Sequence, residues 1–178
     1  AGYGASDFDA GGRATDKNSW RAKTTAWLSE NFPDAKIESI YAAIGESGTY
    51  LGTYIVQDYV IAKNPDLLFI EYAINDTYGG FDKVRAALQL ETIVREIKTA
   101  LPKADIVILL SGDHGQLSGN AWYFPTAQGH ADIAEHYNLP LVYMGRALYD
   151  HITKNSLSWD SLSLIHISEN TRLLSISY

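Results

Sequence analysis

The stretch that decides the fold is Asp66-Leu-Leu-Phe-Ile-Glu-Tyr-Ala-Ile-Asn-Asp76, in which a continuous apolar run leads directly into a polar turn. A run without polar alternation is typical of a strand that is covered on both faces. Such strands belong to parallel sheets with helices packed on each side. We therefore expect a buried strand over residues 66–72, followed at once by the polar segment 73–76.

The same succession of strand and helix recurs on both sides of this stretch. Further strands are expected at residues 36–44, 104–111 and 139–144. Helices are expected at residues 18–33, 50–63, 82–101, 125–137 and 145–154, several of them ended by Pro33, Pro65 or Pro102. This alternation predicts an α/β fold, a three-layer α/β/α sandwich of flavodoxin-like type built on a parallel sheet.

The helix expected at residues 82–101 is amphipathic. Its apolar residues are predicted to share one buried side, made up of Val84, Ala87, Leu88, Val94, Ile97 and Leu101.

Composition restricts the classes of function. The 178 residues suit a single domain, and a formal net charge of −7 argues against a nucleic-acid groove, which needs clustered Lys and Arg. The chain has no cysteine, which excludes disulfides and thiolate metal sites. No apolar run of about 18 residues is present, so no membrane span is expected. No metal or organic cofactor is implied, and the compartment stays open.

In open parallel sheets, chemistry collects outside the carboxyl ends of the strands. Here those ends are the turn at residues 45–48, the pair Asn75 and Asp76, the loop at residues 111–114 and Gly145. The candidate site is therefore sought among these positions.

Two of these positions carry a family resemblance. Directly after the apolar strand, Ala73-Ile-Asn75-Asp76 resembles the third conserved block of SGNH (GDSL) hydrolases, usually G-x-N-D, with Ala73 in place of the glycine. One strand earlier, Ala43-Ile-Gly-Glu-Ser-Gly48 resembles the second block. The resemblance implies that Asn75 donates its side-chain amide to an oxyanion hole and that a glycine, Gly48 or Gly45, donates a backbone N–H. Glu46 is a third candidate for that family position.

Asp76 is expected to be a supporting residue that anchors the turn through backbone N–H groups. Simpler explanations stay open for each position, because asparagine and aspartate also favour turns for local hydrogen bonding and glycine favours tight turns.

Both ends of the chain depart from the family pattern. The opening Ala1-Gly-Tyr-Gly-Ala-Ser6 resembles the stretch just after the first block, so the nucleophilic serine is expected upstream of Ala1. No D-x-x-H sequence, which carries the catalytic histidine, occurs anywhere. The match stops at Asp160, and residues 161–178 have the look of a non-native tail. We therefore expect a partial hydrolase domain at residues 1–160 whose first strand is missing, leaving about four parallel strands.

The implied parent protein is a serine esterase that removes acyl groups, acetyl foremost, from carbohydrates or similar small esters. The fragment itself is predicted to be inactive, because a nucleophile and its histidine are both required. The alternative is a non-catalytic α/β domain that binds a small ligand such as a sugar or a nucleotide, although no phosphate-binding glycine motif follows a strand. A non-enzymatic interaction domain is a further rival.

Several other residues are weighed and set aside. Asp113 and His114 form the best competing site, but a loop histidine is more often a surface group. His130, His136 and His151 fall on expected helices, where solvation is the default. Ser6 does not sit in a G-x-S-x-G pattern. Some aromatic residues could line a sugar cleft, although packing is the commoner role: Tyr50, Tyr54, Trp122 and Tyr123.

Overall fold

The computed structural model describes residues 2–5, 19–112 and 124–156. Strands and helices alternate along these segments, as the apolar pattern predicts. The strands are β1 (Gly2–Ala5), β2 (Tyr41–Ile44), β3 (Leu67–Glu71), β4 (Asp105–Leu110) and β5 (Leu141–Tyr143). The helices are α1 (Trp20–Asn31), α2 (Thr49–Tyr59), α3 (Ala73–Tyr78), α4 (Lys83–Ala100), α6 (Pro125–His136) and α7 (Met144–Lys154), with a 3₁₀ turn, η1 (Ile61–Lys63), after α2.

The five strands form one parallel sheet in the order β2-β1-β3-β4-β5. This confirms the predicted α/β class with a parallel sheet. The expectation of a missing first strand and about four strands is wrong, because Gly2–Ala5 pairs with β2 on one side and β3 on the other. The physical reason is that β2 and β3 present unpaired backbone groups to each other, and a four-residue extended segment satisfies both edges.

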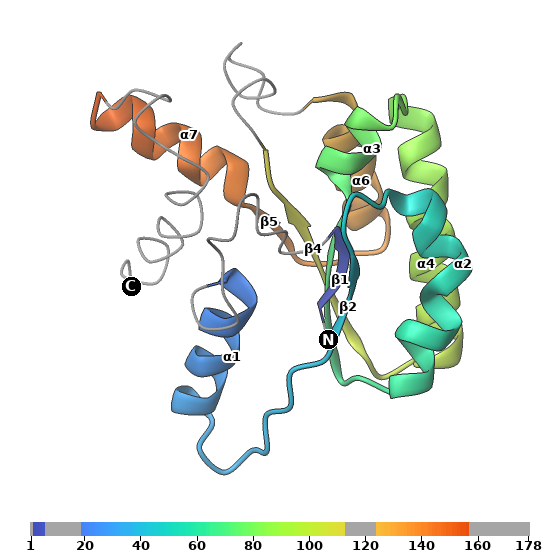
Figure 1. Cartoon of the computed structure of the whole chain (residues 1–178), viewed down its shortest axis with the longest axis vertical. Helices are drawn as coiled ribbons and strands as arrows, with labels where there is room; N and C mark the ends of the chain where they lie inside the picture. Colours follow the sequence, from blue (N-terminus) through green and yellow to red (C-terminus); the bar gives the residue numbers. More distant parts are fainter. Residues whose placement is uncertain (1, 6–18, 113–123, 157–178) are drawn as a thin grey trace. The chain divides into compact units, whose positions relative to one another are not determined.

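The chain divides into two compact units, which are described separately. The first consists of residues 1–6 and 41–146 and holds the whole sheet. Within it, α2, α4 and α6 lie side by side on one face of the sheet (Figure 1).

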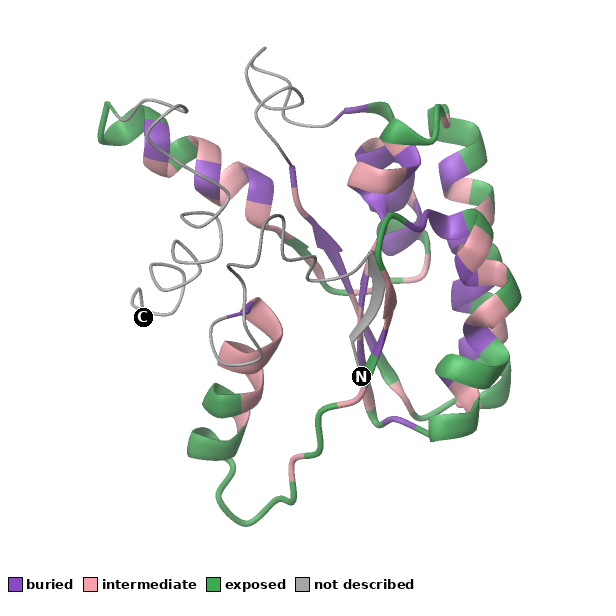
Figure 2. Cartoon of the chain, viewed as in Figure 1, coloured by how far each residue is buried: buried purple, intermediate pink, exposed green. Residues whose placement is uncertain are grey.

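The core of this first unit lies between the sheet and its three helices. Alternate strand residues are buried, such as Leu68 and Ile70 on β3 and Ile106 and Ile108 on β4. Figure 2 shows the matching buried sides of the helices. The α4 side chains that fill this core are Ala86, Leu90, Ile93, Val94 and Ile97.

Two glycines set how closely these helices approach their neighbours. A Cβ at Gly52 of α2 would lie 2.8 Å from both the Tyr72 hydroxyl and Ile93 Cδ1. A Cβ at Gly129 of α6 would collide with the backbone carbonyl of Lys83 at the start of α4. Both positions therefore need glycine for lack of space rather than for backbone freedom.

The second unit consists of residues 7–40 and 147–178 and contains α1 and most of α7. The Ser19 hydroxyl accepts a hydrogen bond from the Ala22 N–H at 3.2 Å, so Ser19 is the N-cap of α1. Leu148 and Ile152, one turn apart, form the buried side of α7.

Candidate functional site

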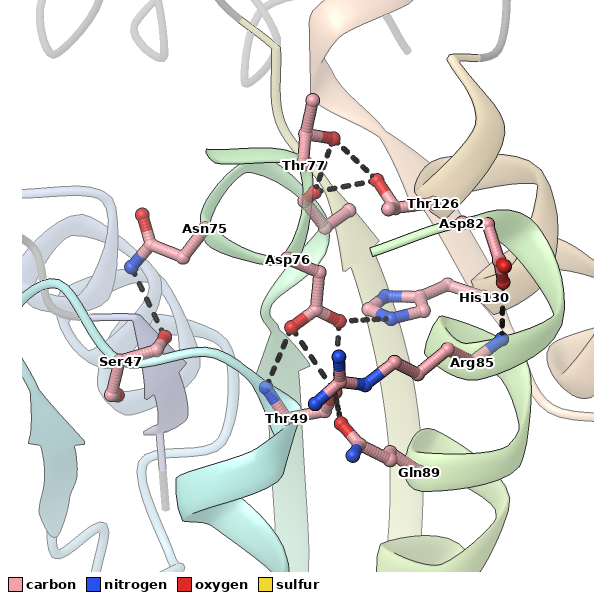
Figure 3. Close-up of polar contacts among 11 residues, drawn as sticks. Ser47, Thr49, Asn75, Asp76, Thr77, Asp82, Arg85, Gln89, Thr126 and His130 are labelled. Atoms are coloured by element: carbon pink, nitrogen blue, oxygen red, sulfur yellow. Dashed lines mark hydrogen bonds and ion pairs between the residues drawn. The ribbon is translucent and has the colours of Figure 1, made fainter. Parts of the chain in front are cut away.

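Two turns that are 28 residues apart in sequence meet at the carboxyl edge of the sheet. The side-chain amide Nδ2 of Asn75 donates a hydrogen bond to the backbone carbonyl of Ser47 at 3.1 Å (Figure 3). Asn75 lies in the first turn of α3, directly after β3, and Ser47 lies in the turn after β2. The fold thus brings together the two segments that the sequence selected. We call this pair of turns, residues 45–48 with Asn75, the rim.

The Asn75 amide is held in place and still has a free donor. It carries two hydrogens, and one of them is used by the Ser47 carbonyl. Among the described residues no acceptor is bonded to the second. The amide is half-buried, which limits its motion while leaving it open to a ligand. An uncharged donor fixed in this way suits an atom on which negative charge develops.

The neighbouring Asp76 is fully buried and occupied by hydrogen bonds. Its Oδ1 accepts from the Thr49 backbone N–H at 2.7 Å, and the Thr49 hydroxyl lies 2.9 Å from Oδ2. The imidazole Nε2 of His130 lies 3.0 Å from the same Oδ2 (Figure 3). Asp76 therefore anchors the first turn of α2 through a backbone N–H, and in addition links α3 to α6.

Gly48 is the buried glycine of the rim. A Cβ at this position would lie only 2.5 Å from Asp76 Oδ1, so the close approach of the carboxylate requires glycine. Among the described residues, no acceptor atom is hydrogen-bonded to the Gly48 N–H. That leaves a buried backbone donor in the turn that Asn75 contacts, directed away from the Ser47 carbonyl because the peptide bond is trans.

The other two candidates of the turn differ from Gly48. Gly45 is exposed. Glu46 is also exposed, but its φ of 61° lies in the left-handed region that favours glycine. A glutamate is strained in this conformation, which glycine adopts at no steric cost.

His130 is the residue that sequence reasoning missed. It was expected on a solvated helix surface, yet its side chain is buried and paired with Asp76. The reason is that His130 falls on the inward side of α6, between Thr126, Ala127 and Ala134, all buried. The spacing of these small residues at three and four positions was the available signal.

This buried group is not a second catalytic site. Thr49, Asp76 and His130 resemble a nucleophile, an acid and a base, but all three are sealed from solvent. The Thr49 hydroxyl also contacts the carboxylate rather than the imidazole. A base must reach the proton it removes, so the geometry fits a structural role.

Glu71, the last residue of β3, is an unusual carboxyl at the same edge. Burial raises the pKa of Glu71 from 4.5 to about 7, and the nearby Asp76 carboxylate raises it further. Hydrogen bonds from the Ser111 side chain and from the Ile74 and Ala73 backbones act in the opposite direction. Its Oε1 atom is buried and has no hydrogen-bond partner among the described residues.

Other predicted residues lie outside the described part of the chain. These are Ser6, Asp113, His114, Trp122, Tyr123 and the segment 161–178. Among the described residues, no serine hydroxyl is bonded to a histidine, and no three His, Asp or Glu side chains could together hold a metal ion. The described helices include none that is long and apolar enough to span a bilayer.

Several solved structures share this fold at low sequence identity. Two structures of a two-domain esterase active on acetylated mannans match with TM-scores of 0.76 and 0.77 at 21% and 20% identity. They cover 91% and 98% of this chain, but the chain spans only 41% and 47% of theirs. An acetyl xylan esterase from Geobacillus stearothermophilus matches with a TM-score of 0.69 at 18% identity, covering 94% of this chain and 88% of its own.

No curated protein sequence matches the chain significantly. The model of the GDSL-like lipase/acylhydrolase family, by contrast, matches residues 1–170. That match covers both turns of the rim and the whole sheet. The chain belongs to the GDSL-like lipase/acylhydrolase family.

Proposed function

We propose that the parent protein is a serine esterase that removes acetyl groups from a carbohydrate, and that Asn75 and Gly48 supply its oxyanion hole. The observation that carries the proposal is the contact between the Asn75 amide and the Ser47 carbonyl, which holds a neutral donor against the turn that contains Gly48. Family membership supports ester hydrolysis as the reaction.

The proposed chemistry follows from the charge that develops during ester hydrolysis. A serine attacks the acyl carbon, a histidine takes the serine's proton, and the carbonyl oxygen becomes an oxyanion. Donors already aimed at that oxygen stabilise it without reorganising. Asn75 and Gly48 are proposed for this role, with Gly45 as the alternative backbone donor. Asp76 and His130 hold the two turns at a fixed separation.

The substrate class is proposed from the structural relatives. The solved structures include esterases described as active on acetylated mannans and as acetyl xylan esterases. We therefore propose an acetylated, uncharged polysaccharide as the substrate. The sequence contains neither the serine motif nor the D-x-x-H motif of the family, so we propose that the 178-residue chain is itself inactive.

The test is acetate release by the full-length parent protein, with p-nitrophenyl acetate and acetylated mannan as substrates. Asn75→Ala should lower kcat by about 100- to 1,000-fold with little change in KM, because the lost contact acts in the transition state. Asn155→Ala, which alters an exposed asparagine, is the control and should leave kcat unchanged. An Asn75→Ala enzyme with undiminished kcat would refute the role given to this amide.

A second comparison tests the activity itself. The 178-residue chain should release no acetate, whereas the full-length protein should. If the full-length protein binds acetylated mannan but releases no acetate, the esterase proposal is wrong and the alternative of a binding domain is favoured.

A further inference from the structure

Two exposed tyrosines follow the rim along α2. Tyr50, in the first turn of the helix, is 48% exposed, and Tyr54 is 80% exposed. They are four residues apart, so their side chains lie next to each other on the outward side of α2. The buried side of the helix is formed instead by Thr49, Gly52 and Val56. We call Tyr50 and Tyr54 the tyrosine strip.

The strip begins at the rim itself. A Cβ placed on Gly48 would lie 3.5 Å from Tyr50 Cδ1, and the same Cβ would lie 2.5 Å from Asp76 Oδ1. The Tyr50 ring is therefore in contact distance of the glycine proposed for the oxyanion hole. Tyr54 continues the surface by one helical turn, about 5.4 Å along the axis.

The Tyr50 ring packs against Phe81. Its centroid lies 6.3 Å from that of Phe81 in an edge-to-face arrangement with an interplanar angle of 70°. Phe81 is in turn covered by the Arg85 guanidinium, 3.9 Å above its ring. Arg85 and Phe81 thus fix the tyrosine while about half of its surface stays open to solvent.

Packing does not account for this surface. No hydrogen bond among the described residues involves the Tyr50 or Tyr54 hydroxyl. Scattered exposed apolar groups are ordinary in proteins, but here two exposed tyrosines lie one helical turn apart on α2, and the first of them adjoins the candidate site. Continuity with the rim therefore indicates a ligand that enters the same site.

The charged side chains near the tyrosine strip indicate which class of ligand it binds. Glu46 at the rim and Asp58 farther along α2 are both exposed, and the chain as a whole carries a net charge of −7. One cation, the Arg85 guanidinium, lies over Phe81 and keeps its charge, so the two carboxylates outnumber it. An anionic polymer would be repelled, whereas an uncharged sugar ring presents C–H groups to an aromatic face and hydroxyls to the tyrosine O–H.

We propose that the tyrosine strip binds successive sugar rings of an uncharged polysaccharide whose acetylated unit lies at the rim. Tyr50 stacks on the ring nearest the rim, and Tyr54 stacks on the next. The placement of the acetylated unit at the rim rests on the proposed esterase function. Binding of the sugar rings to the two tyrosines does not require hydrolysis.

The experiment measures binding of mannopentaose to the 178-residue chain and to the full-length protein by calorimetry. Tyr50→Ala and Tyr54→Ala should each weaken binding about five- to tenfold, the loss expected for one aromatic contact. Tyr59→Ala is the matched control, because Tyr59 lies on the same helix and is 45% exposed but points away from the strip. Polygalacturonate, an anionic polymer, should bind to none of these proteins.

Several results would overturn the inference. These are no binding of mannopentaose at millimolar concentration, equal affinity of the Tyr50→Ala variant and the wild type, or an equal loss in Tyr59→Ala. The alternative is that the tyrosine strip joins two copies of the chain. Sedimentation would then show a dimer in the wild type and a monomer in Tyr54→Ala, and this result would also overturn the inference.

The inference and the proposed function can fail separately. If mannopentaose binding depends on Tyr50 but the full-length protein releases no acetate, sugar binding by the tyrosine strip is supported and the esterase function is refuted. Acetate release from acetylated mannan with an unchanged KM in Tyr50→Ala would retain the esterase and reject the strip.

Discussion

At the scale of single residues, the Asp76 side chain links α3 to both α2 and α6. Its two oxygens bind a backbone N–H, a hydroxyl and an imidazole from two different helices. A buried charge is tolerated only when such partners compensate for its lost hydration. The same bonds fix the distance between Asn75 and Gly48, so stability and the proposed catalytic geometry depend on one carboxylate.

Replacing this carboxylate should therefore be costly. Asp76→Ala leaves the Thr49 N–H and the His130 ring without an acceptor in a buried place, and should lower the free energy of unfolding by about 3–5 kcal/mol. Asp82→Ala is the control, because Asp82 caps the exposed start of α4 by accepting from the Arg85 N–H at 2.8 Å. It should cost only about 1 kcal/mol. Urea unfolding measures both, and equal losses would contradict the role given to Asp76.

Glu71 should make stability fall as the pH rises. Its folded pKa of about 7 lies above the ordinary 4.5, so the folded state holds the proton more tightly than the unfolded state does. This contribution is complete below pH 4.5, is lost between pH 4.5 and 7, and amounts to at most about 3 kcal/mol.

Glu71→Gln keeps the neutral form at every pH and tests this directly. The variant should match the wild type near pH 4.5 and be the more stable protein at pH 8, as measured by urea unfolding at both values. A stability difference that does not vary with pH would show that Glu71 ionises normally.

At the scale of elements, the sequence predicted where helices lie better than which way they face. The helix expected at residues 82–101 is α4, Lys83–Ala100, and Val94 and Ile97 are buried as expected. Val84 and Leu88, assigned to the same side, are exposed. Apolar residues surround much of this helix, and contact with its neighbours α2 and α6 decides which of them are covered.

The contact between α4 and α6 gives a prediction at this scale. Gly129→Ala should lower the free energy of unfolding by about 1–3 kcal/mol, because the new methyl group collides with the Lys83 carbonyl. The intrinsic helix preference for alanine, about 1 kcal/mol, acts in the other direction. Glu135→Ala, on the exposed side of α6, should be nearly neutral. A Gly129→Ala protein as stable as the wild type would show that the two helices can separate at little cost.

At the scale of the whole molecule, the main buried cluster is contained in a central part of the chain. Its buried members run from Ala42 to Ala134, and half-buried members extend it to Tyr143. The predicted non-native tail at residues 161–178 lies outside the described residues. Within the described residues, the cluster ends at Tyr143.

Because the sequence predicts that residues 161–178 are a non-native tail, removing them should leave the melting temperature unchanged. Removing residues 144–178 is the comparison, since it also deletes Leu148 and Ile152, which are buried, and should lower the melting temperature. A fall of about 5 °C or more on deleting only residues 161–178 would mean that the tail belongs to the fold.

The sequence by itself determined the parallel α/β class and the positions of the rim residues, because apolar strands and the polar turns after them are local features of the chain. It did not determine that Gly2–Ala5 lies between β2 and β3 in the sheet, or that His130 is buried against Asp76. Those outcomes depend on which distant segments satisfy unpaired backbone groups and a buried charge. Only the tertiary structure decides them, since the partners lie dozens of residues apart in the chain.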